Sequence, residues 1–123
     1  SAGELAVFVR SDVEFDRAIQ AVERSEVDYR ILDQSMVTVS TQASISTMHL
    51  AKGLEFRAVV VMACDDEIIP SQARIETVVD DSDLAEVYNT ERHLLYVACT
   101  RARDNLLISG VDPVSEFVDD LGN

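Results

Sequence analysis

One short apolar segment constrains the fold of this chain more than any other feature. Residues 58–63 read Ala-Val-Val-Val-Met-Ala, and charged residues lie close on both sides of them. A short run without polar alternation is typical of a strand inside a parallel sheet, where other elements cover both faces. The segment therefore predicts a central strand of an α/β layer.

The rest of the chain alternates between strand-like and helix-like segments. Further strands are expected at 5–9, 29–32 and 106–108, with two more candidates at 37–39 and 44–47. Helices are expected at 13–25, from 83 to about 103, and after Asp112-Pro113. Capping boxes at 11–14 and 83–86, and a proline that follows an N-cap at 112, predict where these helices begin. The alternation predicts an α/β fold with a mostly parallel sheet.

Length and composition indicate one globular unit. The chain has 123 residues, of which 47% are hydrophobic, so we expect residues 1–123 to form a single domain with a substantial core. No run approaches about 20 apolar residues and the first residues carry no basic segment, so we expect neither a transmembrane helix nor a signal peptide. Cys64 and Cys99 each lie in an apolar stretch, which predicts buried free thiols in a cytoplasmic protein. A disulfide remains an alternative, because two cysteines alone do not decide it.

The net charge limits how this chain can meet nucleic acid. It carries 23 acidic and 10 basic residues, which gives a formal charge of −13. Such a domain as a whole is not attracted to DNA or to anionic lipid, so any contact with nucleic acid uses a few local groups. The stretch 65–86 holds eight of the acids and only Arg74 as a base, which suggests an outer surface or a contact with another domain.

Ligands of open α/β sheets bind beyond the carboxyl ends of the strands. This rule selects Arg10, the segment after Thr47 and the loop after Ala63. Arg10 could meet a phosphate there, although on its own a salt bridge to Asp12 or Asp65 is favoured. The acidic run 65–67 could bind magnesium, but a solvated loop is favoured because magnesium sites usually include a phosphate partner.

The segment 47–56 is the most informative part of the sequence. It reads Thr-Met-His-Leu-Ala-Lys-Gly-Leu-Glu-Phe. Gly53 permits a positive φ or a close backbone approach, Glu55 can accept two hydroxyl hydrogen bonds from a ribose, and His49 can contact a phosphate or stack on a base. The residue types alone favour a solvated turn, because short motifs often arise by chance.

The segment 91–103 is the second informative stretch, with Leu-Leu-Tyr-Val-Ala-Cys-Thr-Arg-Ala at its centre. Arg101 stands at the end of the expected helix, where it could clamp a phosphoryl group. Taken alone, the arginines here are better explained as partners of the helix dipole. His49 and His93 lack a third ligand at metal spacing, so no zinc site is expected.

Together these segments resemble the C-terminal RecA-like (2A) domain of superfamily 1 DNA helicases of the UvrD/Rep type. Residues 47–56 are similar to motif V of that family, residues 91–103 to motif VI and residues 8–11 to motif IV. The resemblance spans Leu5 to about Ser109, and the two long segments occur in the family's order. It reverses the preference for the simpler interpretations above.

The resemblance implies a three-layer RecA-like fold of the P-loop NTPase type, without a 2B insertion. It implies ATP with magnesium as the cofactor, held mainly by an N-terminal RecA-like domain of the same parent protein. Arg10 would contact the γ-phosphate, and Arg101 would be the arginine finger, which supplies positive charge to the transferring phosphoryl group. Glu55 would bind the ribose, and Gly53 would shape the turn.

The resemblance also implies single-stranded DNA as a partner, contacted by Thr47 and His49, and no membrane partner. The chain contains no Gly-rich phosphate loop, so by itself it is expected not to hydrolyse ATP. Thr90 and His93 stand where the family often has Glu and Arg. The short interval from 29 to 47 resembles the RecD-like branch, whereas Ala51-Lys52-Gly53 favours UvrD/Rep.

Two other functions compete with the helicase interpretation. The chain could be a degenerate RecA-like module used for protein docking, with the acidic stretch 65–86 as its surface. It could also be a stand-alone receiver-like or flavodoxin-like domain, which would explain the composition and the order of elements but not the segments 47–56 and 91–103.

Overall fold

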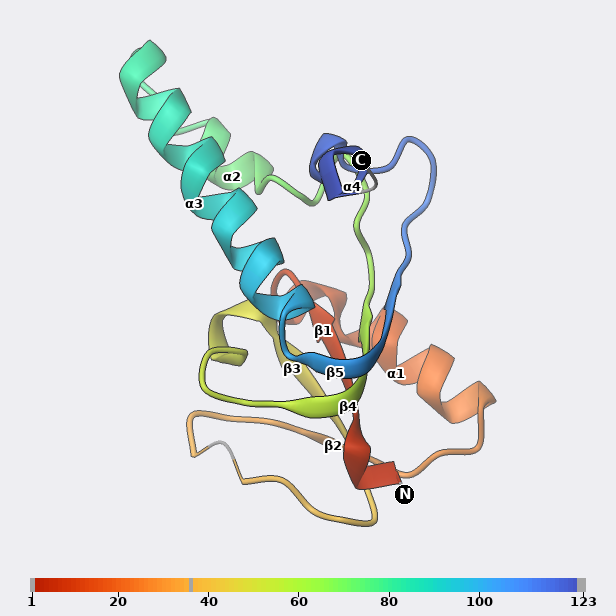
Figure 1. Cartoon of the computed structure of the whole chain (residues 1–123). Helices are drawn as coiled ribbons and strands as arrows, with labels where there is room; N and C mark the ends of the chain where they lie inside the picture. Colours follow the sequence, from red (N-terminus) through yellow and green to blue (C-terminus); the bar gives the residue numbers. More distant parts are fainter. Residues whose placement is uncertain (1, 36, 122–123) are drawn as a thin grey trace.

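Five strands form one sheet in which every neighbouring pair is parallel, in the order β2-β3-β1-β4-β5 (Figure 1). The computed structural model describes residues 2–35 and 37–121. The strands are β1 (Leu5–Val9), β2 (Tyr29–Ile31), β3 (Ala43–Thr47), β4 (Phe56–Val61) and β5 (Ala102–Ile108). The helices are α1 (Phe15–Arg24), α2 (Gln72–Ile75), α3 (Asp81–Cys99) and α4 (Glu116–Leu121), and short 3-10 turns η1, η2 and η3 occupy Ala2–Glu4, Asp12–Glu14 and Met48–Leu50.

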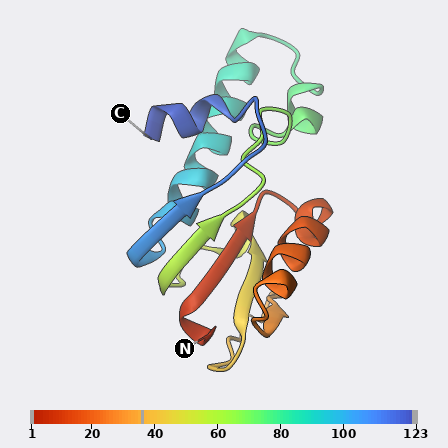
Figure 2. The ribbon, with the colours of Figure 1, turned by 90° about the vertical axis from the view of Figure 1, so that its right-hand side faces the viewer.

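The chain folds into three layers, as predicted. Figure 2 shows α1 on one face of the sheet and α3 on the other, with α2, α4 and the first half of α3 extending past the strand ends. β1 and β4 lie inside the sheet because both of their edges are paired. Residues 58–61 of the apolar run therefore belong to an interior parallel strand, which begins two residues before the run, at Phe56, and ends two residues before its last residue.

The central strand β1 alternates its side chains between the two layers, as the two-residue period of a strand requires. Val7 and Val9 contact the apolar face of α1. Ala6 and Phe8 point to the opposite side, into the larger cluster beneath α3. This alternation explains why the strand sequence is apolar throughout, since every residue after Leu5 is buried on one face or the other.

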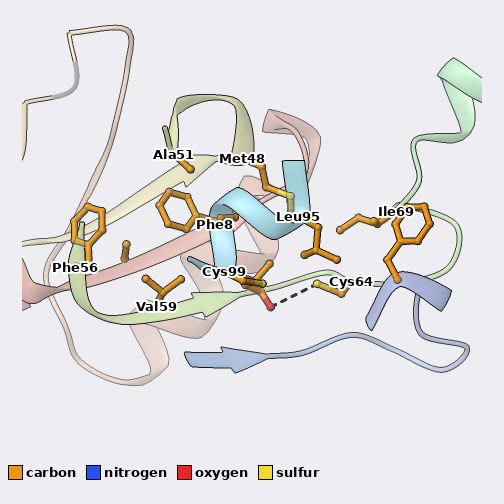
Figure 3. Packing of buried hydrophobic residues seen from close by; sticks show 13 residues of the cluster. Phe8, Met48, Ala51, Phe56, Val59, Cys64, Ile69, Leu95 and Cys99 are labelled. Atoms are coloured by element: carbon orange, nitrogen blue, oxygen red, sulfur yellow. Dashed lines mark hydrogen bonds between the residues drawn. The ribbon is translucent and has the colours of Figure 1, made fainter. Parts of the chain in front are cut away.

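The larger core lies between the sheet and α3. Figure 3 shows Leu95 and Cys99 of α3 beside Phe8 and Met48, and all four are buried. Cys64 also belongs to this cluster, and both cysteines are free thiols, as predicted. Burial raises the pKa of Cys64 to about 12 and that of Cys99 to about 11, so at neutral pH both are protonated and act as small hydrophobic side chains.

Helix ends differ from the sequence-based expectations. Neither predicted capping box forms. In the first, Glu14 N–H donates to the Ser11 carbonyl at 3.0 Å within a 3-10 turn, without a side-chain cap. The long helix begins earlier than predicted, because Asp80 supplies the N-cap by accepting from Asp83 N–H at 2.9 Å. That helix ends at Cys99, which leaves room for β5 to begin at Ala102 rather than 106.

Two further expectations were wrong. Residues 37–39 belong to no strand, and this part of the chain lies in the connection between β2 and β3. The pair at 112–113 does not start the last helix, because Val114 forms an isolated antiparallel bridge with Asp65. The helix starts at Glu116 instead, and the Ser115 hydroxyl accepts from Phe117 N–H at 3.2 Å.

Across the described ranges 2–35 and 37–121, none of the helices combines the length and apolar character that crossing a bilayer would require.

Candidate functional site

The sequence-predicted residues lie in two groups at opposite ends of the sheet. The carboxyl-end group follows the ends of β1 and β3 and consists of Arg10, Thr47 and His49. The amino-end group lies where β4 and β5 begin and consists of Gly53, Glu55 and Arg101. The segment 47–56 connects them, because it runs from the end of β3 to the start of the parallel strand β4.

The backbone conformation at position 53 requires glycine. Its φ is +84°, a region that side chains other than glycine rarely adopt. A Cβ atom built there would meet no heavy atom within 4 Å, so space is not the constraint. The turn is closed by Leu54 N–H, which donates to the Ala51 carbonyl at 3.1 Å. The sequence allowed either a positive φ or a close backbone approach at this glycine, and the structure shows the positive φ.

Gly53→Ala is therefore expected to lower the free energy of unfolding by about 1–2 kcal/mol, because the added Cβ is strained at this φ. Lys52→Ala, in the same exposed turn, is the matched control and should change stability by less than about 0.5 kcal/mol. Urea unfolding followed by circular dichroism measures both. Equal stability of the two variants would contradict the assignment.

Arg101 lies beside this turn with its guanidinium half-exposed. Nη1 donates to the Leu54 carbonyl at 3.2 Å, Nε to the Val97 carbonyl at 3.2 Å, and Nη2 to the Thr100 hydroxyl at 3.1 Å. In turn, Phe56 N–H donates to the Arg101 carbonyl at 2.8 Å, which ties the start of β4 to this residue. All three side-chain acceptors are neutral, so the positive charge of Arg101 has no anionic partner among them.

Glu55 is the exposed acid of the amino-end group. Its side chain is 66% exposed, and its Oε1 lies 3.7 Å from Nε of Arg103, whose side chain is 53% exposed. Exposed pairs at this separation contribute little to stability. Both carboxylate oxygens of Glu55 can therefore accept hydrogen bonds from other donors. Glu55 directly follows Leu54, whose carbonyl accepts from Arg101.

Arg10 is buried in the carboxyl-end group. It is 8% exposed, and its Nε and Nη2 donate to the two oxygens of Glu91 at 2.7 and 2.6 Å. This fork-to-carboxylate geometry is the strongest form of an ion pair between side chains. Its partner is neither Asp12 nor Asp65, as the sequence suggested, because Asp65 pairs instead with Arg17 of α1 at 2.7 Å.

Glu91 is a site residue that the sequence reasoning missed. Its carboxylate is fully buried and also accepts from Ser71 N–H at 2.6 Å and from Arg74 Nη1 at 2.7 Å. Burial raises its pKa, but the surrounding donors, Arg10 first, outweigh burial and hold the pKa below its usual value. A signal existed, because Glu91 shares the buried stripe of α3 with Leu95 and Ala98, where a charged residue requires a partner.

His49 completes the carboxyl-end group. Its Nε2 lies 3.0 Å from Nη1 of Arg10. Because arginine only donates, Nε2 must accept, so the imidazole is neutral with its proton on Nδ1. Partial burial of the ring, and then the positive charge of Arg10, lower the pKa of His49 below 6.5. The residue as a whole stays exposed, and Nδ1–H is left as its ring donor.

The fold should weaken as the pH falls below about 6.5 because of His49. The unfolded chain binds a proton near the ordinary pKa, the folded chain only at lower pH, so the free energy of unfolding falls between these values. In His49→Asn, whose amide oxygen can still accept from Arg10, the fall between about pH 7.5 and about pH 5.5 should be smaller than in the unmutated chain. Urea unfolding at both pH values tests this, and identical losses would contradict it.

Thr47 places the segment that carries His49. It is the N-cap of η3, with extended backbone angles of −76° and 158°, and its side chain is half-buried. The next residue, Met48, is 2% exposed and anchors the turn in the core beneath α3. Thr47 and His49 are therefore held at the carboxyl end of β3 by the backbone that Met48 anchors.

The ion-pair cluster of Arg10, Arg74 and Glu91, beside the carboxyl-end group, carries positive charge on a strongly acidic chain. Arg10 and Arg74 contribute two positive charges and Glu91 one negative charge, so this cluster nets +1 while the whole chain nets −13. Local charge of this kind is what the sequence required of any nucleic-acid contact.

The two arginines selected from the sequence do not converge. Arg10 pairs with Glu91, and Arg101 follows the end of the same helix, at Cys99. Cys99 lies eight positions after Glu91, which is about 12 Å along the helix axis. The two guanidinium groups therefore have different partners, Glu91 and His49 for Arg10 and neutral acceptors for Arg101.

In the acidic loop after β4, the Asp65 carboxylate is held by hydrogen bonds from other parts of the chain. Asp65 accepts from Arg17 Nη1 at 2.7 Å and from Val111 N–H at 2.7 Å, and Arg17 holds the pKa of this carboxyl below its ordinary value. In the parts of the chain that the structure describes, no cluster of three or more His, Cys, Asp or Glu side chains could hold a metal.

Comparison with known proteins gives one family. The sequence model of the UvrD-like helicase C-terminal domain matches residues 5–112. The ATP-dependent DNA helicase UvrD1 of Mycobacterium leprae is 39% identical over 77 residues, which are 63% of this chain and 9% of UvrD1. The ATP-dependent DNA helicase PcrA of Staphylococcus aureus is 39% identical over 66 residues, which are 54% of this chain and 8% of PcrA.

A solved structure shares the fold. The C-terminal domain of a possible DNA helicase from Lactobacillus plantarum WCFS1 superposes with a TM-score of 0.64 at 23% identity, and the match covers 94% of this chain and 60% of that one. The matched segments thus span less than a tenth of the two curated relatives and just under two thirds of the structural neighbour.

Proposed function

Because the chain belongs to the UvrD-like helicase C-terminal domain family, we propose that it is the C-terminal half of an ATP-driven motor that moves on single-stranded DNA. In this proposal an N-terminal ATP-binding domain of the same parent protein holds ATP and magnesium, and the two-domain protein hydrolyses ATP. The single observation that carries the proposal is the position of Arg101 beside the turn at 53–55, where its guanidinium binds three neutral acceptors and no acid among the described residues.

The amino-end group fits a nucleotide presented by another domain. The Leu54 and Val97 carbonyls and the Thr100 hydroxyl hold the half-exposed Arg101 side chain between the turn and the end of α3, and a phosphate oxygen is a stronger acceptor than any of them. The exposed carboxylate of Glu55 suits the hydroxyl groups of a ribose. The magnesium nucleotide supplies the phosphoryl group, and the contribution of this chain is positive charge and orientation.

We assign the phosphate contact to Arg101 alone. A γ-phosphate contact by Arg10 would require its buried ion pair with Glu91 to open, and that pair lies about 12 Å along α3 from the helix end that precedes Arg101. Arg10 is better suited to hold His49 in place.

The carboxyl-end group fits the DNA side of the motor. His49 is exposed with its Nδ1–H available, and Thr47 lies at the end of β3 on a fixed backbone. An imidazole can stack on a base or donate to a phosphate, and a hydroxyl can do the latter. The net positive charge of Arg10, Arg74 and Glu91 supports a phosphate backbone at this edge.

His49→Ala tests the DNA contact. We expect the affinity of the two-domain protein for a fluorescein-labelled oligo-dT strand to fall roughly tenfold, since a stacked aromatic contributes about 1–3 kcal/mol per base. His93→Ala is the matched control, because His93 is also exposed but lies on α3 outside the group. Fluorescence anisotropy at fixed salt measures both affinities. If the two variants bind equally well, His49 is not a DNA contact.

A docking module remains the second candidate. It is motivated by Thr90 and His93, both exposed on α3 at positions where the family often has charged residues. The Thr90 hydroxyl donates to the Val87 carbonyl at 3.1 Å within its own helix. The presence of Arg101, Glu55 and Gly53 together in the amino-end group favours the motor over this alternative.

A further inference from the structure

Glu91 carries a buried negative charge, and the proposed function assigns this residue no role of its own. Its side chain is fully buried, and each of its two oxygens accepts two hydrogen bonds. Holding an ion in the interior costs several kcal/mol unless such partners are present. A carboxylate that serves only to solubilise a helix face would lie on the exposed side of α3.

The four hydrogen bonds to Glu91 join segments that are far apart in the sequence. Arg10 follows the carboxyl end of β1, whereas Ser71 and Arg74 belong to the connection after β4. Glu91 itself sits in the middle of α3. One carboxylate therefore fixes two strand exits and the long helix at the same edge of the sheet.

Through Arg10, this network reaches His49. The guanidinium is planar, and Glu91 holds it by Nε and Nη2, so the direction of Nη1 is fixed. Nη1 in turn donates to Nε2 of His49 at 3.0 Å, which sets both the tautomer and the rotation of the ring. Without the carboxylate, Arg10 keeps its charge but loses the groups that orient it.

From these contacts we infer that Glu91 is a positioning residue, which through Arg10 holds the His49 imidazole in the orientation that contacts single-stranded DNA. The inference rests on the proposed function. Arg101 follows the C-terminal end of α3, and in the described residues its side chain makes no hydrogen bond to this network. Loss of Glu91 should therefore weaken the use of DNA much more than the cleavage of bound ATP.

Glu91→Gln tests this in the two-domain protein. The amide has the same shape, but its nitrogen cannot accept from an arginine, so half of the network is lost. We expect the oligo-dT concentration that gives half-maximal ATP hydrolysis to rise about tenfold, while turnover at saturating DNA falls less than about twofold. Glu86→Gln removes the same charge from an exposed position of the same helix and should change neither quantity.

A double-variant cycle separates positioning from general damage to the fold. In a His49→Ala background, Glu91→Gln should raise the half-maximal DNA concentration by less than about twofold, because the ring that it orients is absent. If Glu91→Gln lowers the folded fraction, Arg10→Lys replaces it in the same cycle, since lysine keeps the charge but not the fork.

Two results would overturn the positioning role while leaving the proposed function intact. One is a half-maximal DNA concentration for Glu91→Gln equal to that of Glu86→Gln. The other is an effect of Glu91→Gln that is as large without His49 as with it. If the unmutated protein shows no hydrolysis stimulated by DNA, the proposed function itself fails, and the positioning role fails with it.

Discussion

Arg101→Ala is expected to slow steady-state ATP hydrolysis by the two-domain protein by about 10³-fold or more. An arginine that neutralises the transferring phosphoryl group contributes about 10³–10⁵ in rate. The contacts of Arg101 to the Leu54 and Val97 carbonyls are neutral and weak by comparison, so removing the side chain should cost little stability. The loss should therefore appear in turnover rather than in the amount of folded protein.

Two further variants test whether the loss of hydrolysis is specific to the guanidinium of Arg101. Arg101→Lys keeps the charge but loses the planar fork, so it should recover only a small part of the rate. Arg57→Ala removes an exposed arginine near the same end of the sheet, where it pairs with Asp104 at 3.0 Å, and should hydrolyse ATP within about twofold of the unmutated protein. If Arg101→Ala turned over as fast as Arg57→Ala, Arg101 would not be the finger.

Arg10→Ala is expected to lower the free energy of unfolding of the chain by about 3–5 kcal/mol, because it leaves the buried Glu91 carboxylate without its main partner. Both side chains are at least nine-tenths buried, so water cannot replace the lost hydrogen bonds without opening the core. Urea unfolding followed by circular dichroism gives the value. The total free energy of unfolding of a single domain is about 5–15 kcal/mol, so the Arg10→Ala variant should retain little stability.

Arg17→Ala is the matched control for this stability prediction. Arg17 also pairs with an acid, Asp65, at 2.7 Å, but its side chain is 37% exposed. Pairs exposed to solvent contribute about 0–1 kcal/mol, so this variant should be the more stable of the two. Replacing Arg10 and Glu91 together by Met and Leu should restore much of the loss, since no unpaired charge is then buried. Equal losses in the two single variants would contradict the buried ion pair.

The middle of the sheet could be predicted from local pattern because β1 and most of β4 are short apolar runs. Residues 58–63 gave the interior strand, and the order of strands and helices gave the parallel layers. Helix ends were less predictable, because alternative caps compete over a few residues. Asp80 took the role expected of Asp83, and Ser115 that expected of Asp112.

The candidate site was predictable only where its residues are adjacent in the sequence. Gly53 and Glu55 share one motif, and the positive φ followed from the need for a turn. The pairing of Arg10 with Glu91 joins residues 81 positions apart, and such a contact depends on how α3 lies across the sheet. The same dependence explains why Arg10 and Arg101, both chosen as phosphate ligands, lie apart: Arg10 pairs with Glu91 in the middle of α3, whereas Arg101 follows the C-terminal end of that helix.

The most direct test of the central claim, that this chain completes an ATP site held mainly by another domain, separates ATP binding from ATP cleavage. In a single-turnover experiment, ATP is bound to the two-domain protein with saturating oligo-dT, and the rate of γ-phosphate release is measured for the unmutated protein and for Arg101→Ala. The account predicts that the variant binds ATP within about tenfold of the normal affinity but cleaves it about 10³-fold more slowly. Cleavage of bound ATP at the unmutated rate would contradict it.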